Sequence, residues 1–304
     1  MIHRHQYQDL LWVDVEKPTH DEVRGLMSEF AIHPVVADEI LTPSLRARVD
    51  HYENFIYLVL HFPAIRHSHN GSIGQEVDFI IGKSFLITVR YEEIDPLHRF
   101  SKVFEVSSLI DKQGVGDHAG FLFFAMISKI YSSLGHELIL ISDTLKDIEQ
   151  HIFHGEESQM VERLSISNRD ILNFRQAMKL HRGVLSSLHS AVGEFFGEDF
   201  AHYIDHITGE YHKLDETLQD LKETIDDLRT TNDSLLASKT TQVIKTLTII
   251  NGSILPASLI SWIFAMDTKH MPIIGTAYDF WIILSMMAFL SSLAYYFFRA
   301  KKWL

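Results

Sequence analysis

The sequence predicts an α+β domain, built as a mixed sheet with helices, followed by a long stalk helix and two transmembrane helices. Three observations predict this order. Stretches dense in β-branched and aromatic residues fill the first third of the chain, a helical pattern continues almost without interruption from Gly120, and two uncharged apolar runs lie near the C-terminus. These are the composition and periodicity signals of strands, helices and membrane spans respectively.

The first third of the chain carries the strand signals. Residues 9–15 (DLLWVDV) alternate well enough for a strand, and residues 54–62 (NFIYLVLHF) are typical of a buried strand. Residues 77–81 and 85–89 are two further strand candidates, joined by a tight turn at Gly82 and Lys83. We therefore expect a small mixed sheet.

Helices are expected between and after these strands. Pro18 and Thr19 open an acidic helical stretch, and a short helix runs from His33 and Pro34 through Ile40. From Gly120 the pattern predicts three helices in succession, over about residues 120–151, 158–196 and from 199 onward.

The third of these helices has a heptad seam. Apolar residues recur at alternating spacings of 4 and 3, and this pattern predicts that the helix packs against partner helices. They are Ile207, Tyr211, Leu214, Leu218, Leu221, Ile225 and Leu228. No proline occurs between Asp199 and Leu255, so this helix can continue into the first apolar run. From residue 199 to 264 its length would be on the order of 100 Å.

The two apolar runs predict two membrane spans. Residues 246–264 and 280–298 are each 19 residues long and carry no charged side chain. At about 1.5 Å of rise per residue, each crosses a hydrocarbon core of roughly 30 Å as a helix. The chain is therefore expected in the cell membrane, either an inner or a plasma membrane, in contact with lipid.

The charges that flank the spans predict the orientation. Lysine and arginine stay on the cytoplasmic side of a membrane. They precede the first span and follow the second, whereas the loop of residues 265–279 holds Lys269 against Asp267 and Asp279. The flanking residues are Lys239, Lys245, Arg299, Lys301 and Lys302. Both termini are expected in the cytoplasm.

Polar residues of the first span fall on one side of the helix. The spacings alternate between 3 and 4, which makes one stripe. Its members are Thr241, Ile244, Thr248, Asn251, Leu255, Ser258 and Trp262. Such a stripe suits a narrow pore with hydrophobic constrictions, and because one stripe cannot enclose a pore, several copies would surround an axis. The alternative is helix packing, in which Asn251, Gly252, Ser253 and Ser258 let neighbouring helices approach closely.

Composition excludes several other function classes. A formal net charge of -13 argues against a nucleic-acid partner, and the absence of cysteine excludes disulfides and thiolate metal sites. No phosphate-binding glycine loop and no catalytic triad or carboxylate pair points to an enzyme or to an organic cofactor. Histidine pairs with ligand-like spacing keep a zinc site open; they are His3 with His5, His67 with His69, and His202 and His206 with His212.

Several motifs resemble one family. Near the C-terminus they are KTLTII at 245–250, Pro256, AMD at 265–267, MP at 271–272 and KKWL at 301–304. Nearer the N-terminus they are WVDV at 12–15 with PT at 18–19, HP at 33–34, RARVDHY at 46–52 and VDFIIGKSFLITV at 77–89. With these motifs the chain resembles the CorA family of divalent-cation channels over essentially its whole length.

The resemblance implies a funnel-shaped homopentamer with one pore-lining helix per subunit. It places the family's Gly-Met-Asn selectivity filter on Ala265, Met266 and Asp267, and the pore-lining positions on Thr241, Ile244, Leu247, Asn251, Leu255 and Ser258. Two filter residues differ, and Ile273 stands where an acidic residue commonly follows the Met-Pro pair. A ring of Asp267 carboxylates would attract a hard divalent cation more strongly than amides do. A backbone turn needing positive φ would be strained at Ala265.

The stalk helix is rich in acidic side chains, for which two interpretations stay open. In the family, acids at subunit borders bind intracellular Mg²⁺ and hold the pore closed. The resemblance places Glu223 nearest such a position, with Asp226 and Asp227 as neighbours. The alternative is a solvated helix face, because spacing along one helix does not show what lies across an interface.

The expected organisation follows from these signals. It comprises an α/β domain with a helical second half (residues 1–198), a stalk (199–245), a pore-lining span (246–264), an external loop with the filter (265–279), a second span (280–298) and a basic tail (299–304). The expected function is uptake of Mg²⁺, with Co²⁺ or Ni²⁺ as surrogates, gated by intracellular divalent cations. The alternatives are a Zn²⁺ transporter and a non-conducting regulatory or structural membrane protein.

Overall fold

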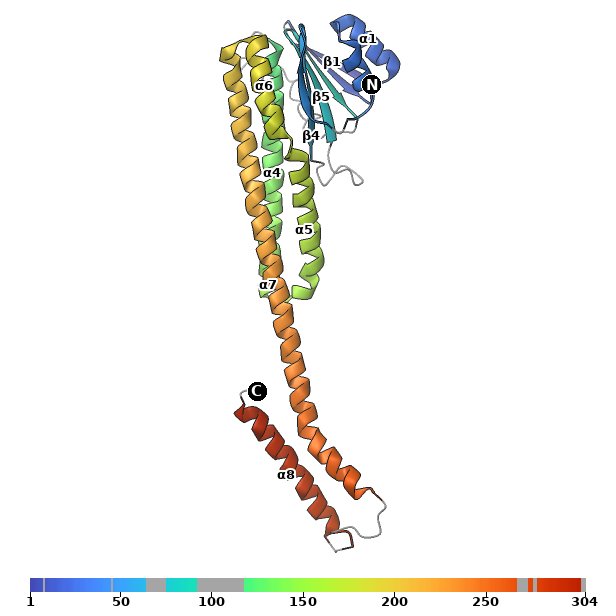
Figure 1. The fold of residues 1–304 in the computed structure, drawn as a ribbon, viewed down its shortest axis with the longest axis vertical. Coiled ribbons are helices and arrows are strands. Elements are labelled where there is room, and N and C mark those ends of the chain that lie inside the picture. The colour runs from blue at the N-terminus through green and yellow to red at the C-terminus, as the bar shows by residue number, and fades with distance from the viewer. Residues whose placement is uncertain are drawn as a thin grey trace. The chain divides into compact units, whose positions relative to one another are not determined.

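The computed structural model describes residues 1–7, 9–44, 46–63, 75–91, 118–266, 273–275 and 278–301. The chain forms two compact units, Met1–Arg229 and Thr230–Leu304. The first unit contains a sheet and several helices, and the second contains a helical hairpin (Figure 1).

A six-stranded mixed sheet organises the first unit. Its strands are β1 (Ile2–Tyr7), β2 (Leu10–Glu16), β3 (Arg48–His51), β4 (Phe55–Phe62), β5 (Gln75–Gly82) and β6 (Phe85–Arg90). The order across the sheet is β1-β2-β6-β5-β4-β3. Strands β2 and β6 pair in parallel, with Val13 opposite Ile87, and every other pair is antiparallel.

The sequence predicted the four inner strands of this sheet and missed both edge strands. Strands β2, β4, β5 and β6 match the predicted stretches to within two residues at each end. Strand β1 is rich in polar residues and β3 has only four residues, none of them buried. An edge strand pairs on one side only, so it buries less side-chain surface and its hydrophobic pattern is weak.

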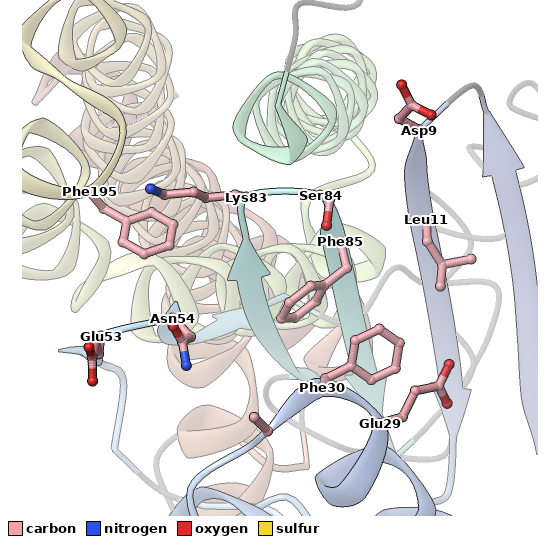
Figure 2. A pocket seen from close by; sticks show the side chains of 11 residues that line it. Asp9, Leu11, Glu29, Phe30, Glu53, Asn54, Lys83, Ser84, Phe85 and Phe195 are labelled. Atoms are coloured by element: carbon pink, nitrogen blue, oxygen red, sulfur yellow. The ribbon is translucent and has the colours of Figure 1, made fainter.

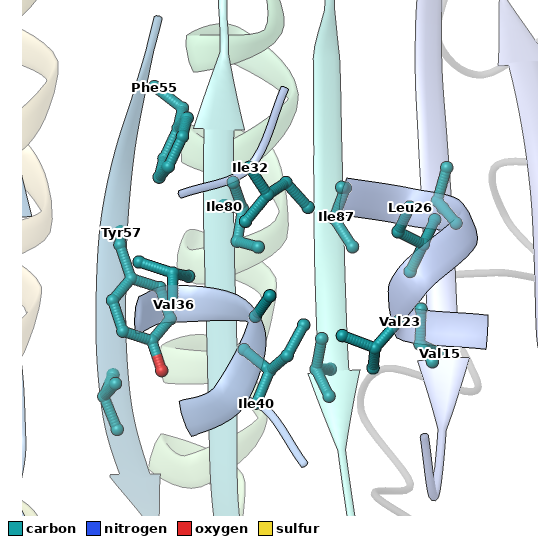
Figure 3. Packing of buried hydrophobic residues seen from close by; sticks show 14 residues of the cluster. Val15, Val23, Leu26, Ile32, Val36, Ile40, Phe55, Tyr57, Ile80 and Ile87 are labelled. Atoms are coloured by element: carbon teal, nitrogen blue, oxygen red, sulfur yellow. The ribbon is translucent and has the colours of Figure 1, made fainter. Parts of the chain in front are cut away.

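Two short helices cover one face of the sheet. Helix α1 (His20–Phe30) begins with a capping box, in which Thr19 and Glu22 exchange hydrogen bonds, and ends at Ala31 in the left-handed region. Helix α2 (Pro34–Glu39) has Pro34 at its first position. Figure 3 shows the apolar residues of α1 and α2, Val36 among them, packed on those of β2, β4, β5 and β6, which include Tyr57 of β4.

Longer helices cover the opposite face. They are α4 (Ala119–Phe153), α5 (Glu157–Met178) and α6 (His181–Phe196) (Figure 1). Phe79 of β5 meets Phe123 of α4 edge-on, with ring centroids 5.4 Å apart. Phe62 of β4 contacts Tyr131 of α4 in a similar way at 6.4 Å. The sheet is therefore sandwiched between two helical layers.

The structure corrects one helix of the sequence analysis. Residues 158–196 were predicted as one helix, but α5 ends at Met178 and α6 begins at His181. Neither glycine nor proline marks this break. The break accompanies complete burial of His181, whose ring binds Tyr131 and the carbonyl of His61. A tertiary contact overrides the local helical pattern there.

Helix α7 (Glu198–Phe264) is a single helix of 67 residues with Pro256 inside it, and α8 (Asp279–Ala300) follows. All seven residues of the predicted heptad seam are buried. In the first unit their partners include the chain's own helices, since a Cβ on Gly135 of α4 would lie 3.6 Å from Leu214. Helices α7 and α8 each contain a stretch long and apolar enough to cross a membrane.

Candidate functional site: a polar stripe on the first membrane helix

The residues predicted to line a pore all lie on α7, and most of them are solvent-exposed in the single chain. Six are exposed and Ser258 is partly buried. They are Thr241, Ile244, Leu247, Thr248, Asn251, Leu255 and Ser258. Trp262, at the end of the stripe, is 70% exposed. Their helical spacing keeps them together along one side of α7.

The hydroxyl groups and the amide of this stripe differ in their bonding. Thr241 and Thr248 donate to the carbonyl oxygens of Ala237 and Ile244, at 2.9 and 2.8 Å. Ser258 donates to Leu255 at 2.9 Å. Asn251 makes no side-chain hydrogen bond in the part of the chain that the structure describes. Its amide, on an exposed side of a helix that can span a membrane, therefore requires an external partner.

A different side of α7 packs on α8. A Cβ added to Gly252 would lie 2.6 Å from the ring of Phe298, and Ser261 approaches the sulfur of Met287 at 3.8 Å. Ile249 and Ile260 are 8% and 6% exposed. Close packing between the two helices therefore explains Gly252 but not Asn251, which lies away from α8.

The predicted filter lies at the C-terminal end of α7. The Ala265 amide still donates to the carbonyl of Ser261 at 3.0 Å, and Ala265 is not among the residues with positive φ. The turn strain considered for Ala265 therefore does not arise in the structure. Met266 is 60% exposed. Asp267, Lys269 and the Met-Pro pair lie outside the described residues, whereas Ile273 has a φ of +83°, unusual for a β-branched residue.

The three acids predicted to bind regulatory Mg²⁺ are exposed on α7. Glu223 and Asp227 face solvent in the single chain, and Asp226 accepts a 2.5 Å bond from Lys222, which also reaches Asn168 of α5 at 3.3 Å. Among the residues that the structure describes, no three histidine, aspartate or glutamate side chains are grouped to hold a metal ion. One chain alone therefore does not assemble this metal site.

The histidines considered for zinc are dispersed. His202 lies 3.7 Å from Asp205 and His206 lies 3.8 Å from Glu210, so each ring faces an acid on its own helix. Both rings are largely exposed. His67 and His69 lie outside the described residues. The described histidines form no shared zinc site.

Sequence reasoning missed a cleft of about 590 Å³ in the first unit. Figure 2 shows Phe30 beside Phe85, with ring centroids 4.7 Å apart, and the Lys83 amine near Phe195. The cleft is lined by Asp9, Leu11, Glu29, Phe30, Ala31, Glu53, Asn54, Lys83, Ser84, Phe85 and Phe195. Because these residues come from separate turns and helix ends, no contiguous motif could reveal the cleft.

Sequence reasoning also missed a buried polar network on the face of the sheet that α4, α5 and α6 cover. Trp12 donates to the Thr88 hydroxyl at 3.0 Å, and Thr88 donates to Asp14 at 2.8 Å. The guanidinium of Arg90 binds Asp14 at 3.1 Å and Glu16 at 3.2 Å. These bonds cross between the parallel strands β2 and β6, so they help to fix the register of that pair.

His181 lies at the junction of the sheet and the helices. The hydroxyl of Tyr131 and the carbonyl of His61 each lie 2.8 Å from one ring nitrogen. A neutral ring satisfies both, since one nitrogen accepts from Tyr131 and the other donates to His61. Burial lowers the pKa of His181 to about 4. The side chain is therefore a neutral structural link.

Comparisons with known proteins agree with this architecture. The profile of the family described as CorA-like Mg²⁺ transporter protein matches residues 7–302. The cobalt/magnesium transport protein CorA of Thermotoga maritima is 23% identical over 297 residues, which cover 96% of this chain and 83% of that protein.

Two solved structures show the same fold. The complete CorA magnesium transporter of Methanocaldococcus jannaschii superposes with a TM-score of 0.82 at 19% identity, covering 98% of this chain and 93% of that one. The full-length CmaX protein gives a TM-score of 0.75 at 16% identity, with 97% and 89% covered. The predicted α+β fold with a long helix and a C-terminal apolar helix is confirmed. The family consists of membrane transporters and not of enzymes. Since its profile spans nearly the whole sequence, the chain belongs to the CorA-like Mg²⁺ transporter family.

Proposed function

We propose that copies of this chain assemble as a homopentamer that conducts Mg²⁺ across a cell membrane, with Co²⁺ and Ni²⁺ as surrogates. The observation that carries the proposal is the unpartnered amide of Asn251, in a polar stripe that α8 leaves uncovered. Polar side chains at the depth of a membrane usually face other helices or a water-filled path. Membership of a transporter family supports a water-filled path beside this stripe.

The stripe suits passage of a cation that keeps part of its water. Mg²⁺ loses its water shell reluctantly, so it is best carried by groups that accept hydrogen bonds from bound water. The carbonyl oxygen of Asn251 and the hydroxyl oxygens of Thr241, Thr248 and Ser258 are such groups. Ile244, Leu247 and Leu255 between them would narrow the path, and a hydrophobic constriction can close by dewetting.

The outer mouth is proposed to be a ring formed by Ala265, Met266 and Asp267 of each copy. Their Asp267 carboxylates would concentrate divalent cations ahead of the stripe. The orientation with both termini in the cytoplasm then makes entry favourable, since each unit charge gains about 2.3 kcal/mol per 100 mV of inside-negative potential. A divalent cation needs no other energy source.

Closure by internal Mg²⁺ is proposed to involve Glu223, Asp226 and Asp227. Each is exposed in the single chain and therefore available to a neighbouring copy. Because α7 runs without a break from these acids to the stripe, a bound cation between subunits could restrain the helices that line the path. Lys222 already pairs with Asp226, so Mg²⁺ would have to displace that amine.

This gating proposal predicts a specific loss of regulation. The triple variant with Glu223→Gln, Asp226→Asn and Asp227→Asn should conduct Mg²⁺ when internal Mg²⁺ is high enough to close the wild type. A matched triple variant at the exposed acids Asp143, Glu149 and Glu162 should keep normal closure. Flux is measured at several internal Mg²⁺ concentrations. Equal inhibition of both variants would contradict the role of the α7 acids.

The proposed function is tested by Mg²⁺ uptake into proteoliposomes that contain a Mg²⁺-sensitive dye, under an inside-negative potential. We expect uptake that hexaammine cobalt, an inert mimic of hydrated Mg²⁺, blocks from outside. Replacing Asp267 by alanine should weaken both uptake and block, because the mouth would lose its carboxylate ring. A folded oligomer without Mg²⁺ flux would contradict the proposal. Zinc uptake in a parallel assay would then identify a Zn²⁺ transporter, whereas the absence of flux for either cation would indicate a regulatory or structural role.

A further inference from the structure

Two carboxyl groups lie side by side inside the first unit. Glu76 and Asp78 are two residues apart on β5, so their side chains face the same side of the sheet. It is the face that α1 and α2 cover, because Tyr57 and Ile80 of the apolar cluster point the same way. Glu76 is 7% exposed and Asp78 is completely buried. Burying two adjacent carboxylates without compensation would be strongly unfavourable.

Hydrogen-bond donors surround Glu76. The backbone N–H of Ser44 donates to both of its oxygens, at 2.9 and 2.7 Å. The Nε2 atom of His61 lies 3.1 Å from one of them. The Glu76 carboxylate raises the pKa of His61, which favours an imidazolium beside it. Glu76 therefore has the donors that a carboxylate needs.

The surroundings of Asp78 favour its neutral form. Its Oδ2 atom accepts a 3.0 Å bond from Tyr57, whereas Oδ1 has no hydrogen-bond donor although it is fully buried. Glu76 lies two residues along the same strand and on the same face of the sheet. Burial and the neighbouring Glu76 raise the pKa of Asp78 well above its usual range. A proton on Asp78 would convert the repulsion between the two groups into a hydrogen bond.

The hydroxyl of Tyr91 gives a second reason to place a proton there. It lies 3.1 Å from the carbonyl oxygen of Ile40 and 3.3 Å from Oδ2 of Asp78. A phenol carries one proton, so it cannot donate fully to both acceptors. If it donates along the shorter contact to Ile40, a protonated Asp78 can itself donate to one of its neighbours. Burial raises the pKa of Tyr57 and of Tyr91, so both remain hydroxyl donors.

The charged groups of β3 and α2 near the pair form their ion pairs with one another. Arg48 of β3 lies over the Tyr57 ring, with 5.4 Å between its guanidinium carbon and the ring centroid, but its ion pairs are with Glu39 and Asp50. No ion pair to Asp78 occurs among the described residues. The titratable groups that face the pair are His61 and Tyr57 of β4, Tyr91 after β6, Arg48 and Asp50 of β3, and Glu39 of α2.

We propose that Glu76 and Asp78 form a proton-binding site that holds one proton in the folded N-terminal unit and thereby fastens residues 40–44 to the sheet. These residues are attached by the bonds from Ser44 to Glu76, from Tyr91 to Ile40 and between His61 and the Ser44 carbonyl, the last at 2.8 Å. Loss of the proton places a second negative charge beside Glu76. The two carboxylates then repel, and the Ser44 and Tyr91 attachments weaken.

The direction of the pH dependence follows from the raised pKa of Asp78. The folded state keeps a proton that the unfolded state releases above the ordinary aspartate pKa. The stabilisation is therefore complete at low pH and is lost as pH rises through the pKa of folded Asp78. The raised pKa of His61 acts in the same direction, because its imidazolium is lost as pH rises. A rise in pH through the pKa of folded Asp78 should therefore release residues 40–44.

The test uses the full-length protein in lipid nanodiscs and two measurements. Infrared difference spectra between wild type and Asp78→Asn detect a protonated carboxyl, whose C=O stretch is separate from that of carboxylates. Hydrogen exchange with mass spectrometry follows residues 40–44 over a range from about pH 5 to about pH 8, where folded proteins are usually most stable. Asp21→Asn is the matched control, because the Asp21 side chain on α1 is 94% exposed and is not among the groups that face the pair.

We expect a protonated-carboxyl band in wild type and in Asp21→Asn that Asp78→Asn lacks. Exchange of residues 40–44, corrected for its intrinsic pH dependence, should increase with pH in wild type and not in Asp78→Asn. Glu76→Gln should move loss of the band to lower pH, because the neighbouring charge is removed. A spectrum without the Asp78 band would overturn the proposal. So would a Mg²⁺-dependent loss of that band at constant pH, which would identify the pair as a cation site.

Discussion

Replacing Asn251 by leucine is expected to lower Mg²⁺ influx by roughly 100-fold. The hydroxyl groups of Thr241, Thr248 and Ser258 donate to carbonyl oxygens of their own helix. Among the polar side chains of the stripe, only the amide of Asn251 has no hydrogen-bond partner in the part of the chain that the structure describes. A polar contact to an ion or its water is worth up to about 3 kcal/mol. Losing that contact raises the barrier by about two factors of ten. In the proposed oligomer, the leucine side chains of all copies would also form an additional apolar constriction between the levels of Thr248 and Leu255.

The measurement is the initial rate of dye-detected uptake at matched protein density. Asn251→Gln keeps an amide and should retain far more flux than Asn251→Leu. Ile249→Leu, on the side of α7 that contacts α8, is a second control and should conduct normally. Near-normal flux through Asn251→Leu in an intact oligomer would remove Asn251 from the proposed path.

Replacing His181 by phenylalanine should destabilise the first unit by about 2 to 6 kcal/mol, because two buried groups lose their partner. Phenylalanine fills similar space but leaves the Tyr131 hydroxyl and the His61 carbonyl buried without partners. Each unsatisfied group costs about 1 to 3 kcal/mol. The matched control is His189→Phe, because His189 is 44% exposed and its only described ion-pair partner is Asp205. Apparent melting temperatures by circular dichroism compare the two, and equal temperatures would contradict a structural role for His181.

His181 also predicts a dependence of stability on acid. The pKa of His181 in the folded protein is about 4, below the ordinary 6.5. At a pH between these two values, the unfolded chain binds a proton at His181 and the folded chain does not. Its stabilisation is complete above the ordinary pKa and is lost as pH falls from about 6.5 toward about 4. This direction is opposite to that of Asp78. The acid slope should disappear in His181→Phe, and a slope unchanged from wild type would assign the effect to another group.

Features that repeat along the chain could be predicted from the sequence. The two spans and the long α7 follow from uncharged runs and an unbroken helical pattern, and the inner strands follow from dense β-branched and aromatic residues. Features made by distant residues could not. The edge strand β1 has a polar sequence, and the break before His181 depends on Tyr131 and on His61, 120 residues away.

The candidate site shows the same division. Helical spacing alone placed Asn251, Thr248 and Leu255 on one side of α7, but it could not tell a pore from a helix contact. The structure places Gly252 against Phe298 and leaves Asn251 exposed, so helix packing accounts for Gly252. The filter positions rest on the resemblance to the family, and the buried pair of Glu76 and Asp78 was not visible as a pair because strand alternation does not reveal what covers each face.

The central claim is that the Asn251 stripe lines the path of the cation, and thiol labelling tests it most directly. The chain contains no cysteine, so a single introduced cysteine is the only target of a thiol reagent. We predict that a positively charged methanethiosulfonate reagent blocks Mg²⁺ flux through Thr248→Cys and Asn251→Cys, that hexaammine cobalt slows the block, and that Ile249→Cys is unaffected. Equal modification at all three positions, or block at Ile249→Cys alone, would contradict the account.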